Sequence, residues 1–209
     1  MRVQTVRLAV VVLSAGVLAA TGCTTESSGT AGRPPTGGAT ASPTARPTGD
    51  VDLAAAVRRW WLRVASIPAS RYFDSRRCGL NQPDTVWLLG GGTPRGRSER
   101  TCAVPAGRPI LAPVVNYVMR AGDPRSTLSA GRMDVTLDGR PLTPARVTNG
   151  RPYAIASAVP GNPVDFKSGE RVADDGWWVL IEPGLAPGRH RLDIRVSGMA
   201  SRLWTLIVS

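Results

Sequence analysis

Residues 191–196 read Arg-Leu-Asp-Ile-Arg-Val, a strict alternation of polar and apolar side chains. A period of two is typical of a β-strand with one buried and one solvated face, because successive side chains point to opposite sides. The same alternation occurs over 133–137, and a tight-turn dipeptide, Asp138-Gly139, follows it. The pattern predicts a hairpin whose return strand passes through 145–147.

Further apolar runs indicate more strands. The segments 85–89 and 109–117 are short, apolar and bounded by Gly and Pro, which favours buried strands over helices. A last apolar run covers 202–208. Several short strands at close spacing, with turn residues between them, are typical of a β-sandwich or a jelly roll. We therefore expect a mainly β fold: a β-sandwich or jelly-roll-like domain.

One segment has a helical period instead. Asp52 is a suitable N-cap for a helix over 53–65, and Pro68 marks its end. We expect one N-terminal amphipathic helix that packs on an apolar surface of the domain. Paired tryptophans at this spacing favour a core position over a ligand platform. The expected apolar face holds Leu53, Val57, Trp60, Trp61 and Val64, and the expected solvent face holds Arg58, Arg59 and Arg63.

The N-terminus has the pattern of an export signal. A short basic segment is followed by an apolar run over 8–20 and by Thr21-Gly22-Cys23. The run is too short for a permanent membrane span, and small residues before a cysteine match a bacterial lipoprotein signal. We therefore predict a signal peptide over 1–22 and lipidation of Cys23. An ordinary secreted protein with a free Cys23 is the alternative.

Composition divides the rest of the chain. Residues 23–50 are rich in Thr, Ser, Gly and Pro and have hardly an aliphatic side chain. Such a segment buries too little apolar surface to offset its ordering entropy, so we predict a disordered linker. Residues 51–209 have a normal size for a single domain with one core. The predicted protein is thus a domain held by a linker on the extracytoplasmic face of a cell membrane.

The remaining cysteines favour a disulfide. With Cys23 lipidated, Cys78 and Cys102 are left, and an exported compartment favours their pairing. A metal site is the alternative, but it needs more ligands than two distant thiols and one histidine supply. We expect no metal and no cofactor.

The chain is strongly basic, with a formal net charge of +11. Almost all of the positive charge is arginine, since Lys167 is the only lysine. The arginines are scattered without a block of like charges, so we expect no specific nucleic-acid partner. Base composition of the genome is one explanation. An electrostatic polyanion binder is the alternative.

Candidate acid–base residues are few. His190 is the only histidine, and it stands between Arg189 and Arg191, which should lower its proton affinity. A surface position is the simpler interpretation. Carboxylates that cluster near Asp175 leave open a glycan- or peptide-hydrolysing enzyme. Solvated turn residues are the alternative for this cluster, which consists of Asp165, Glu170, Asp174, Asp175 and Glu182.

Polar side chains beside apolar strands form the candidate ligand site. Amides and carboxylates next to aromatic faces are typical of carbohydrate or peptide recognition. The same groups also satisfy buried backbone atoms in many folds, and both interpretations stay open. The six candidate residues are Asn81, Gln82, Trp87, Asn116, Asp175 and Trp177.

Three blocks of the chain resemble a family. The blocks 78–83, 86–91 and 100–116 contain Cys-Gly-Leu-Asn-Gln-Pro, Val-Trp-Leu-Leu-Gly-Gly and Arg-Thr-Cys with Pro-Ala-Gly-Arg-Pro and a final Pro-Val-Val-Asn. They are similar to the pattern of an uncharacterised family of exported bacterial and archaeal proteins. The resemblance covers most of 55–200, and Ala112 departs from it where an aromatic residue is usual. It implies one domain and a Cys78–Cys102 bridge, and it implies no activity.

These observations favour a binding or accessory module over an enzyme. We expect a surface lipoprotein whose partners are the membrane, through Cys23, and a cell-wall polymer or another envelope protein. The hydrolase and the polyanion binder are the alternatives.

Overall fold

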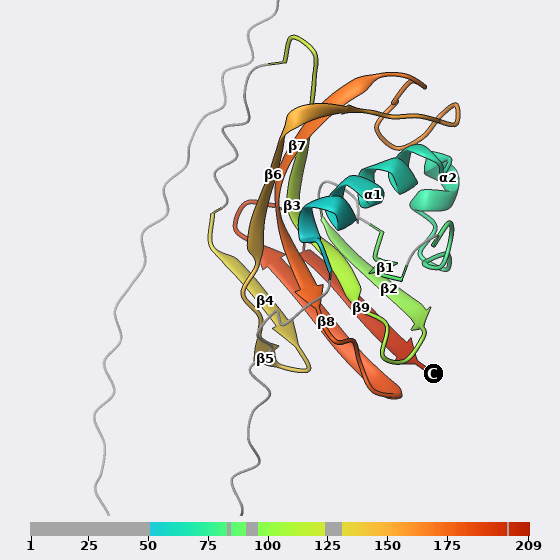
Figure 1. Ribbon diagram of the computed structural model, residues 1–209. Coiled ribbons are helices and arrows are strands. Elements are labelled where there is room, and N and C mark those ends of the chain that lie inside the picture. The colour runs from blue at the N-terminus through green and yellow to red at the C-terminus, as the bar shows by residue number, and fades with distance from the viewer. Residues whose placement is uncertain (1–50, 83–84, 91–95, 124–130, 200) are drawn as a thin grey trace, which may run out of the picture. The chain divides into compact units, whose positions relative to one another are not determined.

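A computed structural model describes residues 51–209, except 83–84, 91–95, 124–130 and 200 (Figure 1). The predicted signal peptide, Cys23 and the predicted linker lie outside the described residues. The described residues form two helices and nine strands. These are α1 (Leu53–Ala65), α2 (Ala69–Tyr72), β1 (Trp87–Leu88), β2 (Arg97–Val104), β3 (Ile110–Arg120), β4 (Met133–Leu137), β5 (Arg140–Pro141), β6 (Ala145–Ala154), β7 (Arg171–Ile181), β8 (Gly188–Val196) and β9 (Ser201–Val208).

The strands form two mixed sheets, as expected for a mainly β sandwich. The four-stranded sheet has the order β1-β3-β7-β6, and the five-stranded sheet has the order β2-β9-β8-β4-β5. The pairs β1–β3 and β2–β9 are parallel, and the other pairs are antiparallel. Helix α1 lies across one face of the four-stranded sheet (Figure 1).

The four-stranded sheet lies between α1 and the five-stranded sheet, and it is buried on both faces where these layers overlap. Leu111 and Trp178 belong to the core beneath α1, whereas their neighbours Ala112 and Val179 belong to the core between the sheets. Burial on both faces explains why β3 is a continuous apolar run rather than an alternation. The alternating strand β8 has the five-stranded sheet's inner face on one side and solvent on the other: Leu192 and Ile194 are buried, and Arg191 and Arg195 are exposed.

The predicted hairpin is right in its turn and wrong in its return strand. Asp138 and Gly139 both have positive φ, 51° and 77°, which is the conformation of a tight hairpin turn. The return strand is the short β5, which pairs with the end of β4. Residues 145–147 instead begin β6, which crosses to the other sheet and pairs with β7. Pairing with β7 buries Val147 against the core beneath α1.

Helix α1 begins after Asp52, whose carboxylate accepts a hydrogen bond from the Ala55 amide at 3.0 Å. Trp60 and Trp61 are both buried, in the core position that their spacing favours. The Trp60 indole donates to the Leu89 carbonyl at 2.6 Å, and its ring meets Trp178 edge to face with centroids 5.2 Å apart. These contacts fix the helix on the sheet.

The position of Arg63 differs from the prediction, which placed this side chain on the solvent face of α1. Its side chain is buried and donates to the carbonyls of Leu80, at 2.8 Å, and Cys78, at 3.2 Å. Burial lowers the pKa of Arg63 to about 10. The arginine thus supplies donors to an irregular segment, and Gln82 donates to the Cys78 carbonyl as well, at 3.3 Å.

Cys78 and Cys102 form the predicted disulfide, with their Cα atoms 5.3 Å apart. The bridge joins the irregular segment after α2 to strand β2. Both cysteines belong to the core between the sheets.

Candidate functional site

The upper ends of β3, β6 and β7 extend beyond the five-stranded sheet (Figure 1). On these ends, the face turned away from α1 has no layer of the five-stranded sheet over it. We call this surface the distal face. Side chains that alternate along the three strands form it, namely Tyr117 and Met119 of β3, Arg146 and Thr148 of β6, and Arg171, Ala173 and Asp175 of β7.

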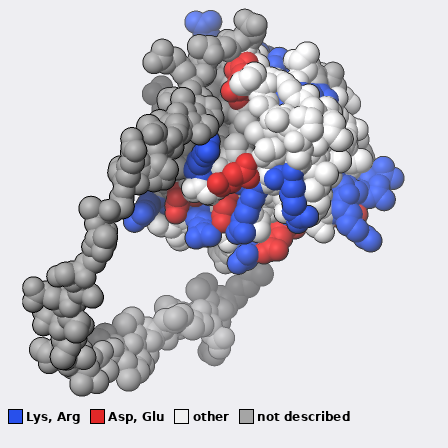
Figure 2. Space-filling view, turned by 90° about the horizontal axis from the view of Figure 1, so that it is seen from below, with Lys and Arg blue, Asp and Glu red and all other residues white. Residues whose placement is uncertain are grey.

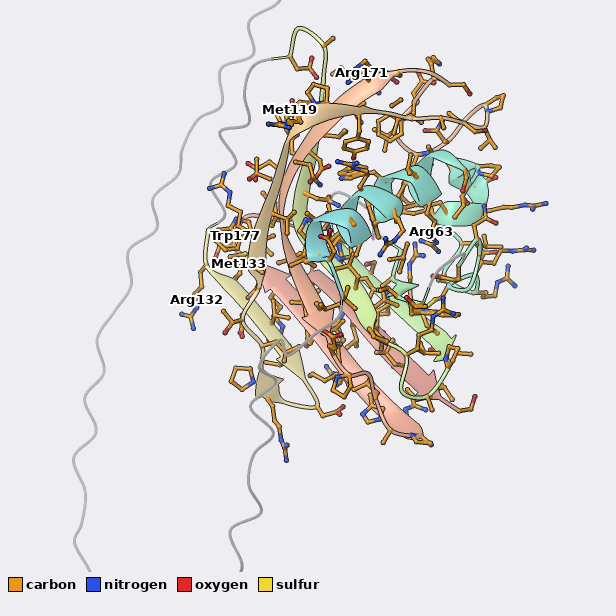
Figure 3. All side chains as sticks on the ribbon, in the orientation of Figure 1. Arg63, Met119, Arg132, Met133, Arg171 and Trp177 are labelled. Carbon is orange, nitrogen blue, oxygen red and sulfur yellow. A yellow bond between two sulfur atoms is a disulfide. The ribbon has the colours of Figure 1, made fainter. Side chains whose placement is uncertain are left out.

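The distal face contains a concavity of about 690 Å³. Figure 3 shows Met119 and Arg171 at this end of the sheet, with Trp177 nearer to the five-stranded sheet. Its lining combines small residues with Asp175 and the arginines Arg146 and Arg171. The lining residues are Met119, Arg120, Ala121, Gly122, Asp123, Arg146, Thr148, Gly150, Pro152, Arg171, Ala173 and Asp175.

Asp175 and Arg146 form a two-point ion pair at the base of the concavity. Arg146 Nε donates to Asp175 Oδ1 at 3.0 Å, and Arg146 Nη2 donates to Oδ2 at 2.8 Å. The Thr148 hydroxyl donates to Oδ1 at 3.0 Å. The Asp175 side chain is 2 % exposed, whereas the Arg146 side chain is 46 % exposed. A buried carboxylate therefore holds a guanidinium that faces solvent, and it raises the pKa of Arg146.

Two more arginines belong to the lining and have different partners. Arg120 is opposite Val172 in the register, and its guanidinium lies over the Phe166 ring on the α1 side, where it donates to the Glu170 carboxylate and to the Val164 carbonyl, both at 2.7 Å. Arg171 donates to the Pro152 carbonyl at 2.6 Å. Among the described residues, no carboxylate lies within ion-pair distance of Arg171. Its charge is therefore the one at the rim that no described carboxylate neutralises.

Asp174 belongs to the opposite face of the same sheet. Its carboxylate is fully buried beneath α1 and accepts hydrogen bonds from the Tyr153 hydroxyl at 2.8 Å and from Asn149 Nδ2 at 3.1 Å. Burial raises the pKa of Asp174 above its ordinary value, and the hydrogen bonds from Tyr153 and Asn149 oppose this shift. The role of Asp174 is in the core.

The six predicted site residues do not lie on one surface. The Gln82 side chain bonds both backbone groups of Leu88 in β1: it donates to the Leu88 carbonyl at 2.8 Å and accepts from the Leu88 amide at 2.9 Å. Asn81 donates to the Ser66 carbonyl at 3.1 Å, and Trp87 is largely buried beside Arg108. These three residues therefore satisfy or cover atoms at the edge of the four-stranded sheet.

Asn116, Asp175 and Trp177 lie together in the middle of the β3–β7 pair. Asn116 is opposite Gly176, which places it on the α1 face, whereas Asp175 and Trp177 are on the other face. Trp177 packs on the core between the sheets. Leu111 pairs with Leu88 of β1, to which Gln82 is hydrogen-bonded, and it is five residues from Asn116 in β3. About 17 Å therefore separates the group of Asn81, Gln82 and Trp87 from the group of Asn116, Asp175 and Trp177. Of the six residues, only Asp175 lines the concavity.

The sequence reasoning missed Arg146, Thr148 and Arg171. A weak signal existed in Arg146-Val147-Thr148, where polar side chains stand on either side of one apolar residue. Val147 and Asn149 face α1, and Arg146 and Thr148 face the concavity. What the pattern did not give is the partner strand, because register depends on the whole sheet.

His190 differs from the expectation based on its neighbours in sequence. Its Nδ1 lies 2.7 Å from Asp138 Oδ2, and its Nε2 lies 3.0 Å from the Ala186 carbonyl oxygen. Both ring nitrogens face acceptors, so the doubly protonated ring satisfies both contacts. The hydrogen bond with Asp138 therefore raises the pKa of His190, although Arg189 and Arg191 flank it in sequence.

The described part of the chain contains no group of three or more His, Cys, Asp or Glu side chains placed to hold a metal ion. None of its helices combines the length and apolar character that crossing a membrane requires.

Comparison with known proteins gives little. No known family model matches the chain, and no curated protein matches its sequence. A chain from a solved complex, "Structure of PbICP-C in complex with falcipain-2", is 11 % identical and has a TM-score of 0.26, over 59 % of this chain and 98 % of that chain. At this TM-score the likeness carries no argument about this protein.

Proposed function

We propose that this chain is an exported lipoprotein, anchored to the extracytoplasmic face of a cell membrane through Cys23, whose domain binds a component of the cell envelope. The basic segment, the apolar run and the small residues before Cys23 support export and lipidation. The Cys78–Cys102 disulfide is consistent with an oxidising compartment outside the cytoplasm.

The concavity on the distal face is the observation that carries the binding proposal. It is large enough for a small ligand, and it combines apolar lining with a few convergent polar groups. Asp175 holds Arg146 by two hydrogen bonds while leaving that arginine half exposed. A charged group that is fixed before a ligand arrives costs less ordering entropy on binding.

The positions of the acidic residues favour binding over hydrolysis. A pair of catalytic carboxylates must flank one scissile bond. Asp174 and Asp175 lie on opposite faces of the sheet, and each is engaged by neighbouring donors. Glu170 is paired with Arg120, and Asp165 is paired with Lys167. In this arrangement no two of these four carboxylates are placed to flank one substrate bond.

Charge distribution is the relevant observation for the polyanion alternative. On the face seen in Figure 2, basic and acidic side chains are intermixed rather than segregated into one basic patch. Asp193, for example, lies between Arg191 and Arg195 and is paired with both. Intermixed charges on this face do not support general attraction to polyanions, so we favour specific recognition at the concavity.

Co-sedimentation with isolated cell-wall material tests the proposal. We expect the full chain to bind and Arg171→Gln to lose binding. Arg140→Gln removes one charge from the short β5 hairpin and should bind like the unmodified chain. Equal losses in both variants, with a steep fall in binding as salt rises, would instead indicate the polyanion binder. No binding by the unmodified chain would contradict the proposal.

A further inference from the structure

We infer that the concavity recognises a single carboxylate group carried on a small aliphatic moiety, with Arg171 and Arg146 as the binding cations and Asp175 as a positioning residue. This inference rests on the proposed function and adds the chemical class of the ligand.

The charges that line the concavity match a monoanion. Of the described arginines that line it, Arg120 is paired with Glu170 and Arg146 is paired with Asp175, whereas Arg171 has no carboxylate partner among the described residues. A ligand with one negative charge would balance Arg171. A dianionic phosphate ester would carry more charge than Arg171 balances and would be repelled by Asp175 and Asp123.

Arg146 has donors left for a ligand after pairing with Asp175. Its Nε and one Nη2 proton are directed at the carboxylate oxygens, which leaves Nη1 for other partners. The Thr148 hydroxyl helps to hold the carboxylate at the base. Asp175 therefore sets the plane and direction of the guanidinium. A fixed planar fork is suited to a planar carboxylate.

Arg171 supplies the charge that is not already balanced. It makes one hydrogen bond, from Nη2 to the Pro152 carbonyl, and no described carboxylate pairs with it. That bond ties the guanidinium to strand β6 while Nε and Nη1 stay available. Both cations line the same concavity, Arg146 from β6 and Arg171 from β7.

The apolar lining indicates what is attached to the carboxylate. Ala173, Gly150, Met119 and Pro152 contribute apolar atoms to the lining. Small aliphatic groups are suited to contact with such a surface. The C-terminal end of a short peptide with small side chains has this chemistry. A carboxylated sugar shares the carboxylate, and the experiment separates the two sources.

Titration of the purified full chain with four probes tests the inference. The probes are N-acetyl-alanyl-alanine with a free carboxylate, its C-terminal amide, glucuronic acid and inorganic phosphate. We expect the free dipeptide acid to bind and the amide to bind about ten- to a hundredfold more weakly, the factor for losing a charge-assisted hydrogen bond. Binding of glucuronic acid without the dipeptide would support carboxylate recognition but would overturn the aliphatic moiety and assign the carboxylate to a sugar.

Variants separate recognition from folding. Arg171→Gln and Asp175→Asn should weaken binding of the favoured acid by about ten- to a hundredfold, whereas Arg140→Gln should not change it. Asp175 acts through Arg146, so Asp175→Asn should also lower the preference for acid over amide. Unchanged unfolding midpoints would show that the losses are not due to unfolding.

Several results would overturn the inference. These are equal binding of acid and amide, tighter binding of phosphate than of either carboxylate, or equal losses in Arg171→Gln and Arg140→Gln. If cell-wall material binds in an Arg171-dependent manner but no carboxylate probe binds, the inference fails and the proposed function stands. If the wall material does not bind either, both fail.

Discussion

Asp174 and Asp175 are neighbours in β7, yet their carboxylates lie on opposite faces of the four-stranded sheet. Tyr153 and Asn149 hold Asp174 beneath α1, and Arg146 and Thr148 hold Asp175 at the base of the concavity. Both carboxylates are almost fully buried. The alternation of side chains along a strand thus places a core residue and a candidate site residue one peptide bond apart.

The lipid anchor gives the first prediction. Replacing Cys23 with Ala removes the only group that could carry a diacylglyceryl chain at this signal, so the protein should move from the detergent phase to the aqueous phase or remain as an uncleaved precursor. Incorporation of radiolabelled palmitate into the unmodified chain is the direct measurement. An unmodified chain that takes up no label would refute the anchor.

Reduction of the disulfide should destabilise the domain. Cys78 and Cys102 are 24 residues apart, and in the loop-entropy model closing such a loop contributes about 3.5 kcal/mol. For a domain of this size the unfolding midpoint should fall by about 7–14 °C. Thermal unfolding with and without reductant measures this. The Cys78→Ala/Cys102→Ala double variant is the control, because reductant should not change its midpoint.

The His190–Asp138 contact predicts a pH dependence near neutrality. The pKa of His190 is raised in the fold above its ordinary value of 6.5, so its contribution to stability is complete below about that pH. The contribution is lost as the pH rises through the folded pKa. The stability difference between the unmodified chain and His190→Gln should therefore shrink as the pH rises above about 6.5 and through the raised folded pKa. A difference that stays constant as the pH rises above about 6.5 would show that His190 is not the titrating group.

Asp174 should show the opposite type of dependence. Its folded pKa is raised above 3.8, so above that value the folded state binds more protons than the unfolded state. Stability from this group is greatest at low pH and falls as the pH rises through the interval between the two pKa values. Asp174→Asn should therefore gain stability relative to the unmodified chain as the pH rises. Chemical denaturation over a pH series tests this, and an unchanged difference contradicts it.

The sequence was informative where local pattern decides the structure. Alternation identified β8, and apolar runs identified β3 and β9. The cap at Asp52 and the helical period identified α1. Each of these depends on residues that are near one another in the chain. Strands β2 and β7 were missed because charged residues interrupt their apolar pattern. In β2 the charged side chains are mostly on the exposed face, and in β7 they include the buried carboxylates Asp174 and Asp175, which have hydrogen-bond partners.

The candidate site could be predicted only in part for a related reason. Asp175 was singled out from its neighbourhood, but its partner Arg146 is 29 residues away and reaches it through the β6–β7 register. That register is set by packing of the whole sheet, not by local sequence. Arg63 was misplaced because the helical period does not show which carbonyls lie nearby.

The matched pair Asp174 and Asp175 gives the most direct test of the claim that the distal face is a recognition site. Binding of the purified full chain to isolated cell-wall material should be measured for Asp174→Asn and Asp175→Asn, with unfolding midpoints recorded for both. We predict that Asp175→Asn loses binding while remaining folded, and that Asp174→Asn binds like the unmodified chain. Unimpaired binding by folded Asp175→Asn, or equal losses in both variants, would contradict the claim.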